Sequence, residues 1–327
     1  MQKKVPEKLP QKLPEKLPEY WPLVWETLDA LTAHYGPVID HAAEQLGIPY
    51  GEWYGWLMAA KIFEPEPISA ARLHVRAAYT NPALQEERLA KGVQLGLLAP
   101  AGQGEYHLTN AGDAAVRQLI DAAYAAMGPL HPLPDADLAR LLDLLRRLVE
   151  ASLAAAEPPG KWCLRVARHY DPAGRAGMMP QLDQYLSDLA AYRDDAHLAA
   201  WKPFGVTGQA WETLTHLWHG DISTLDDLCA KHCARRGYSC DSYAAVLREL
   251  IARGWVIEQN GSFRISEQGR RLREEAEATT DRYFLAPWSS LTPAELEDLG
   301  RLLMRVRDAL QPADAALPAD AALPTGA

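Results

Sequence analysis

The chain has little cysteine, no long apolar run and no excess of positive charge. Its 327 residues include only four cysteines, too few for the disulfide framework of a small secreted domain. No run of about 18 or more apolar residues is present, so no membrane-spanning helix is expected. The sequence also lacks the pattern of a secretory signal peptide. We therefore expect a reduced, cytoplasmic protein.

The shortage of positive charge restricts the partners of the chain. Asp and Glu number 43 against 33 Lys and Arg, which gives a formal net charge of -10. An acidic body repels the phosphate backbone of nucleic acids. Any nucleic-acid-binding surface must therefore be a local basic patch.

Both ends of the chain are low in complexity. Residues 1–19 are a Pro-punctuated repeat built on KLPEKLP, and residues 313–327 repeat the segment PADAALP. Neither has the apolar periodicity that offsets the entropy of ordering. We expect two disordered tails.

Between the tails the sequence repeats with an offset of 158 residues. Matches of this kind, in order and at a nearly constant spacing, indicate an internal duplication. We place one copy at 20–157 and the other at 161–312. The matching residues include Leu28 and Leu186, Trp53 and Trp211, Gly96 and Gly254, Leu141 and Leu299.

Each copy has the same predicted order of elements. An amphipathic helix and a Trp-bearing helix are followed by two short helices, a β-hairpin, a long helix and a leucine-rich helix. Asn260-Gly261 is a strong hairpin turn. Three helices followed by a hairpin are typical of a winged helix-turn-helix. The predicted fold is mainly α, with two winged helix-turn-helix domains packed through their N- and C-terminal helices. The helices are predicted near 22–34, 52–62, 68–79 and 82–96 in the first copy and near 180–201, 208–218, 224–237 and 240–254 in the second.

One junction in each copy resembles a known family. YHLTNAG at 106–112 and FRISEQGRRL at 263–272 look like the LTxxG junction between wing and helix in MarR-like transcription regulators. The resemblance implies a fused dimer in one polypeptide, binding to double-stranded DNA, and an effector site between the copies. The chain departs from the family in lacking the Asp-x-Arg of the wing, where it has Gly-Gln-Gly and Gln-Asn-Gly.

The second copy is the stronger candidate for contact with DNA. Its arginines fall on the two short helices, the wing and the start of the next helix, where guanidinium groups suit phosphate contacts, and its polar residues near the recognition helix suit base edges. The alternative is a solvated face whose arginines balance nearby acidic pairs. The first copy offers only Arg72, Arg76, Arg88 and Lys91. The candidate DNA-contacting residues are Arg235, Arg236, Ser239, Ser242, Tyr243, Arg248, Arg264 and Arg270.

The segment YRDDAHLAAW at 192–201 places charged residues on one helix, and the first copy lacks them. One interpretation is a set of ion pairs between the copies around a core histidine. A second is a pocket for an aromatic or planar small molecule. A third is a metal or catalytic site, for which His169, His216, His219 or His232 would have to complete the set. The candidate ligand-binding residues are Tyr185, Arg193, Asp194, His197 and Trp201.

Three cysteines gather in the second copy. Cys229 and Cys233 lie one helical turn apart and Cys240 begins the next helix. We interpret them as apolar packing residues on the buried helix stripe. A redox sensor and a zinc site remain the alternatives.

The chain carries no catalytic motif: no phosphate-binding glycine loop, no G-x-S-x-G and no H-E-x-x-H. We predict no cofactor, no catalytic residue and no metal. The predicted function is a DNA-binding transcriptional regulator, a single-chain pseudo-dimer modulated by a small ligand between the copies. The alternative is a winged-helix fold used for small-molecule or protein interaction without DNA, and a DNA-repair-type enzyme is a minor reading.

Overall fold

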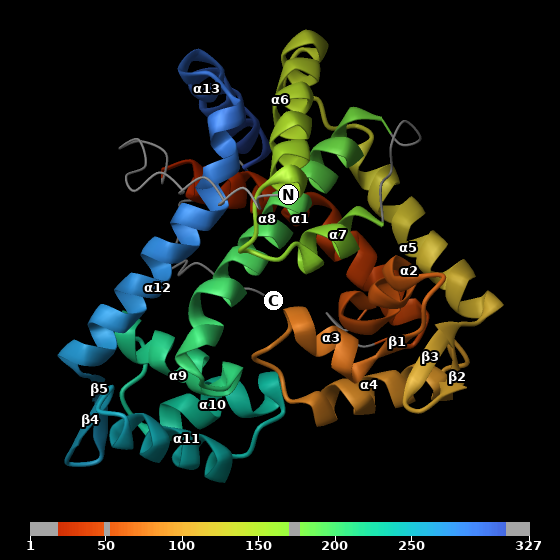
Figure 1. The fold of residues 1–327 in the computed structure, drawn as a ribbon. Coiled ribbons are helices and arrows are strands. Elements are labelled where there is room, and N and C mark those ends of the chain that lie inside the picture. The colour runs from red at the N-terminus through yellow and green to blue at the C-terminus, as the bar shows by residue number, and fades with distance from the viewer. Residues whose placement is uncertain (1–18, 49–52, 170–176, 312–327) are drawn as a thin grey trace, which may run out of the picture.

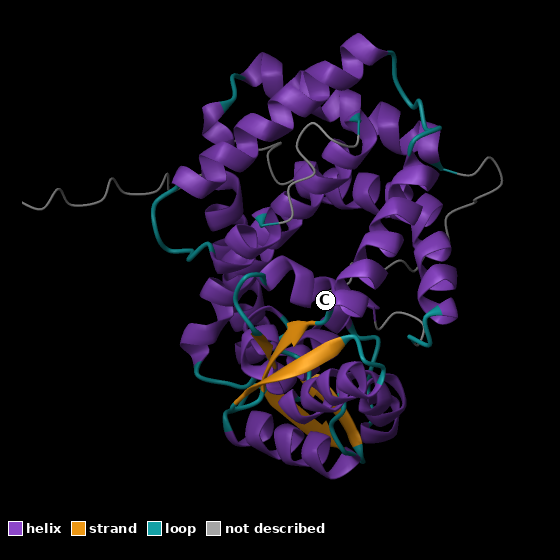
Figure 2. Ribbon diagram, turned by 90° about the vertical axis from the view of Figure 1, so that its right-hand side faces the viewer, coloured by secondary structure: helices purple, strands orange, loops and turns teal. Residues whose placement is uncertain are grey.

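The structure, a computed structural model, describes residues 19–48, 53–169 and 177–311. It is mainly helical, with two small antiparallel sheets (Figures 1 and 2). Both predicted tails lie, apart from residue 19, outside the described residues. No helix in the described ranges has the length and apolarity needed to cross a bilayer.

The first half of the chain, residues 20–157, runs from a long helix through several shorter ones to a small sheet and two further helices. The prediction of two short helices followed by a hairpin is correct here. The structure adds the short strand β1, which pairs with β3, and it extends the first helix well beyond residue 34. The elements are α1 (Tyr20–Gln45), η2 (Tyr54–Met58), α2 (Ala59–Phe63), β1 (Ile68–Ser69), α3 (Ala70–Arg76), α4 (Pro82–Gln94), β2 (Leu98–Gly102), β3 (Glu105–Leu108), α5 (Asn110–Met127) and α6 (Asp135–Ala154).

The second half, residues 161–311, follows the same order after one additional helix, α7, which the sequence patterns did not predict. Its hairpin pairs Val256 with Ile265 and Gln259 with Ser262. The elements are α7 (Trp162–Arg168), α8 (Met178–Trp201), η3 (Lys202–Phe204), α9 (Gly208–His219), α10 (Leu225–Arg236), α11 (Cys240–Ala252), β4 (Val256–Gln259), β5 (Ser262–Ile265), α12 (Glu267–Leu285), η4 (Ala286–Ser290) and α13 (Pro293–Leu310).

The glycine of the repeated junction motif is required by a close approach of backbone to backbone. A Cβ on Gly112 would lie 2.0 Å from the Leu97 carbonyl oxygen, and one on Gly269 would lie 2.3 Å from that of Trp255. In both halves a hydroxyl caps the following helix by accepting the glycine N–H, because a free helix N-terminus leaves backbone donors unpaired. Thr109 does so in the first half and Ser266 in the second, each at 3.0 Å.

The two halves share one hydrophobic core in the upper part of the molecule as drawn in Figure 1. Leu31 of α1, Leu145 of α6, Leu189 of α8 and Leu303 of α13 are all fully buried in it. Burial of about 1.5–3 kcal/mol per such side chain makes each half depend on the other. A second hydrophobic core includes buried residues of α9, α10 and α11.

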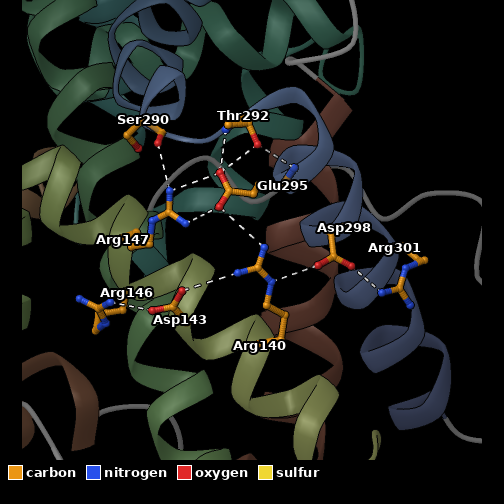
Figure 3. A network of polar contacts seen from close by, with 9 residues as sticks. All are labelled: Arg140, Asp143, Arg146, Arg147, Ser290, Thr292, Glu295, Asp298 and Arg301. Atoms are coloured by element: carbon orange, nitrogen blue, oxygen red, sulfur yellow. Dashed lines mark hydrogen bonds and ion pairs between the residues drawn. The ribbon is translucent and has the colours of Figure 1, made fainter.

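An ion-pair network joins α6 to α13 (Figure 3). Arg147 contacts Glu295 at 2.5 Å, and Arg305 contacts Asp137 at 2.6 Å. Under the 158-residue offset Asp137 corresponds to Glu295 and Arg147 to Arg305, so the two pairs exchange roles. Arg140 pairs at 3.2 Å with its own equivalent, Asp298. Exposed pairs of this kind contribute little energy, but they define how the two helices face each other.

Candidate nucleic-acid interface and the contact between the halves

The candidate DNA face lies on α10, α11, the β4–β5 hairpin and the start of α12, in the lower part of Figure 1. Four predicted arginines on it are exposed: Arg235, Arg248, Arg264 and Arg270. None of the four forms an ion pair with any of the residues that the structure describes. Their charges are therefore available to a phosphate backbone, whereas most other arginines of the chain already face a carboxylate.

The two predicted serines stand at the start of α11. Ser239 is exposed and caps the helix by accepting the Ser242 N–H at 3.2 Å. The Ser242 hydroxyl is half-buried and donates to Gln209 Oε1 at 3.0 Å. Ser239 can therefore face a ligand directly, whereas Ser242 would first have to give up an internal hydrogen bond.

Two of the predicted DNA contacts are wrong because their side chains are buried. Arg236 Nη2 lies 2.6 Å from Glu212 Oε1 with both side chains at most 5 % exposed, and Tyr243 is fully buried. Neither can reach a duplex without leaving the core. The sequence pattern could have indicated that Arg236 is buried. Leu228, His232 and Arg236 recur at four-residue spacing and form the buried face of α10.

The corresponding face of the first half is mixed in charge, because α4 carries the half-buried Arg88 and Lys91 beside two glutamates. The exposed side of α4 presents Glu86 and Glu87. Of the basic residues in this half, Arg72 pairs with Glu66 and Arg76 with Asp194, each at 2.7 Å. The exposed glutamates weaken attraction to phosphate, so this face is less suited to a nucleic acid than that of the second half.

The turns that precede α4 and α11 touch each other. The Asn81 N–H donates to the Arg236 carbonyl oxygen at 2.8 Å, and Asn81 Nδ2 donates to that of Gly237 at 2.8 Å. The Tyr79 ring stacks on Trp201 with centroids 6.2 Å apart. The N-termini of α4 and α11 are therefore neighbours (Figure 1). In a two-fold helix-turn-helix dimer the recognition helices stand about one helical turn of DNA, about 34 Å, apart.

The charged cluster of α8 is used within the protein. Asp194 accepts from Arg76 Nε of the first half at 2.7 Å, which is the ion pair between copies that the sequence left open. Asp195 accepts the N–H groups of Cys163 and Leu164 at 2.9 and 3.0 Å and so caps α7. Arg193 pairs with Asp281 at 2.9 Å.

His197 is a neutral core histidine. Trp211 Nε1 donates to its Nε2 at 3.3 Å, which places the ring proton on Nδ1, 3.4 Å from Thr280 Oγ1. Burial lowers the pKa of His197 to about 4. No second histidine approaches it among the described residues to complete a metal set with Asp194.

The remaining candidate ligand residues also pack internally. Trp201 is buried and stacks on Trp211 at 5.8 Å, and the half-buried Tyr185 ring lies 5.9 Å from the Arg168 guanidinium. The open space nearby is a shallow pocket of about 520 Å³. It is lined by Val75 of the first half and by residues of the second, including Trp162, Asp195, Leu198 and Lys202.

The cysteines do not all behave as packing residues, which corrects the interpretation from sequence. Cys229 and Cys240 form a disulfide that joins α10 to the first residue of α11. Cys233 keeps a free thiol 3.6 Å from Cys240 Sγ. The sequence could place Cys229 and Cys240 on adjacent helices, but only the packing of α10 on α11 brings their sulfur atoms together.

Comparison with known proteins bears on the same region. Residues 185–318 match the model of a helix-turn-helix family. The second half therefore contains a helix-turn-helix domain. No curated protein matches the chain significantly. No solved structure does so either.

Proposed function

We propose that this chain is a DNA-binding regulator that contacts double-stranded DNA through its second half. The observation that carries the proposal is the coincidence of the helix-turn-helix match with four exposed arginines that have no carboxylate partner among the described residues, Arg235, Arg248, Arg264 and Arg270. Helix-turn-helix domains place the N-terminal part of the second helix in the major groove, with flanking basic residues on phosphates. Here that helix is α11 and β4–β5 is the wing of a winged helix-turn-helix.

The proposal includes a fused pseudo-dimer of MarR-like type. The exchanged ion pairs of α6 and α13 support it, since a two-fold interface makes each contact twice with the roles reversed. The common order of elements in the two halves and the glycines at 112 and 269 support it as well. The fused chain permits the two halves to diverge, as the glutamates of α4 and the arginines of the second half have done.

The contact between the turns limits how such a protein can bind. With Asn81 hydrogen-bonded to the end of α10, α4 and α11 cannot enter successive major grooves. We therefore expect this form to recognise one site with α11, not a palindrome with two equivalent half-sites.

The test is a salt titration of binding to a random duplex, followed by fluorescence anisotropy. If the four arginines each neutralise one phosphate, the slope of log K against log salt is about -4, because each contact contributes about -0.9. The double variant Arg248→Ala, Arg264→Ala should lower that slope by about 2 and weaken binding at every salt concentration. The control is Arg146→Ala, which removes an exposed arginine of α6 from the opposite end of the molecule.

Equal affinity of the double variant and the wild type would contradict the role given to these arginines. Absence of binding even at low salt would favour the second candidate, a helix-turn-helix fold used for small-molecule or protein interaction without DNA. The exposed glutamates of α4 and the hydrogen bond between Asn81 and Gly237 favour that candidate. An aromatic or planar effector would then be sought at the pocket between Val75 and Leu198, where it would touch both halves.

A further inference from the structure

A cluster of possible metal ligands lies between α9 and α10, away from the candidate DNA face. Glu212 and His216 are one turn apart on α9, and His232 faces them from α10. One ligand atom from each residue lies within 4.8 Å of those from the other two. The His216 and His232 rings have centroids 4.6 Å apart, and His232 Nδ1 is 3.8 Å from Glu212 Oε2. A single ion between them would need only small side-chain movements.

The strongest sign of a ligand is the state of His232. Its side chain is 1 % exposed, and neither ring nitrogen has a hydrogen-bond partner. Buried polar groups are nearly always paired, and an unpaired one is destabilising. The histidine lies beside two other ligand-type groups, so an ion there would satisfy one of its two unpaired nitrogens.

The surroundings of the cluster already orient the other two groups. His216 Nδ1 lies 3.0 Å from Asp221 Oδ2, and Lys231 holds the same carboxylate at 2.5 Å. A carboxylate on one ring nitrogen, which leaves the other free, is the usual outer-shell support of a metal-bound histidine. Arg236 binds Glu212 mainly through Oε1, at 2.6 and 2.9 Å, which leaves a lone pair of Oε2 directed toward His232.

We propose that Glu212, His216 and His232 form a site for one borderline divalent transition ion of the Zn²⁺ and Co²⁺ class. Two imidazoles and one carboxylate are a typical zinc ligand set, with a fourth position left for water. Mg²⁺ and Ca²⁺ require oxygen ligands and are excluded by the two nitrogens.

Binding would brace the second half independently of any contact with DNA. The ion would tie α9 to α10, and Glu212 would continue to hold Arg236, whose Nη1 reaches Thr80 of the first half at 3.5 Å. The metal would thus fix α9 relative to α10, and with these helices the contact between the two halves.

The experiment is a titration of the full-length, chelator-treated protein with Co²⁺, followed by its visible d–d absorption. The Cys229–Cys240 disulfide is kept intact and Cys233 is alkylated, so that thiolates do not compete for the ion. We expect one Co²⁺ per chain, displaced by one equivalent of Zn²⁺ and not by Mg²⁺. His232→Ala should abolish the signal, whereas His219→Ala, an exposed histidine on the same helix α9, should keep it. Asp221→Asn should weaken binding by about 10–100-fold, as outer-shell substitutions do.

The proposal would be overturned by the absence of Co²⁺ and Zn²⁺ binding to the wild-type protein, or by binding to His232→Ala equal to that of the wild type. His216→Ala alters a partly exposed ligand and provides a second variant if His232→Ala does not fold. Binding that appears only when the cysteines are reduced, with thiolate-to-cobalt charge-transfer bands, would place the ion at Cys229, Cys233 and Cys240 instead and would also refute the assignment.

Discussion

The contact between the two turns can be tested with one methyl group, at Gly208. This residue is the first of α9, and a Cβ built on it would lie 2.0 Å from the Ala78 carbonyl oxygen and 2.6 Å from the Ala78 carbonyl carbon. Both atoms belong to the backbone and cannot rotate away. In Gly208→Ala the turn at 77–81 must therefore move by about 1 Å or more to restore ordinary contact distances of about 3.5 Å.

The magnitude follows from what that movement breaks. The two hydrogen bonds of Asn81 contribute about 1 kcal/mol each, and partial exposure of Ala78 and Tyr79 costs a further 1–2 kcal/mol or so. Alanine in place of glycine in a helix returns about 0.5–1 kcal/mol. We expect the free energy of unfolding to fall by about 2–3 kcal/mol, mostly through loosening of the contact between the halves.

The assay is urea unfolding followed by tryptophan fluorescence, because Trp201 and Trp211 lie beside the contact. The control is Gly160→Ala, where a Cβ would meet no atom within 4 Å. If the contact between the turns before α4 and α11 limits access to DNA, loosening it in Gly208→Ala should also make this variant bind the random duplex more tightly than the wild type. A free energy of unfolding within 0.5 kcal/mol of the control would refute the reasoning, because it would mean that the turn at 77–81 does not lie against the start of α9 in solution.

Three further predictions concern Asp183, His197 and the disulfide. Burial raises the pKa of Asp183 from 3.8 to about 6, so the contribution of this carboxyl group to stability falls as pH rises from about 4 to about 6. The Asp183→Asn variant can still accept the hydrogen bond of the Tyr35 hydroxyl. It should be about 2–3 kcal/mol more stable than the wild type at pH 7 and no more stable at pH 4. For His197 the sign is reversed, because its folded pKa of about 4 lies below 6.5: wild-type stability should fall by about 3 kcal/mol between pH 6.5 and pH 4, and acid unfolding of His197→Gln should lack this component. The Cys229–Cys240 disulfide closes a loop with a sequence separation of 11, so a dithiol reductant should lower the free energy of unfolding by about 2–3 kcal/mol. The double variant Cys229→Ser, Cys240→Ser should be insensitive to the reductant. If this variant responded as strongly as the wild type, the effect of the reductant would arise elsewhere in the protein.

The parts of the fold that depend on neighbours in sequence were predictable. Gly96 and Gly254 end their helices with φ of +72° and +73°, as glycine after an apolar-periodic segment predicts. The Asn260-Gly261 turn forms the predicted hairpin. The short strand β1 was missed because two residues are too few to show an alternating pattern, and α7 was missed because its N-terminus is capped by Asp195, distant in sequence.

The candidate site was predictable only in part, for the same reason. Arg248 and Arg264 are exposed as expected, because surface positions follow from local periodicity. Arg236 looks equally suitable in the sequence, yet it is buried by Glu212, a residue on another helix.

The sequence by itself determined the order of helices and hairpins in each half and the glycines at the two junctions, because periodicity, caps and turns act over a few residues. Only the tertiary structure decided which charges are free and which are paired. It also brought the turns at Asn81 and Gly237 into hydrogen-bonding contact and joined Cys229 to Cys240 in a disulfide. In the same way it placed Glu212, His216 and His232 next to one another. These contacts arise where helices distant in sequence pack together, and their energies depend on burial and distance that no local pattern encodes.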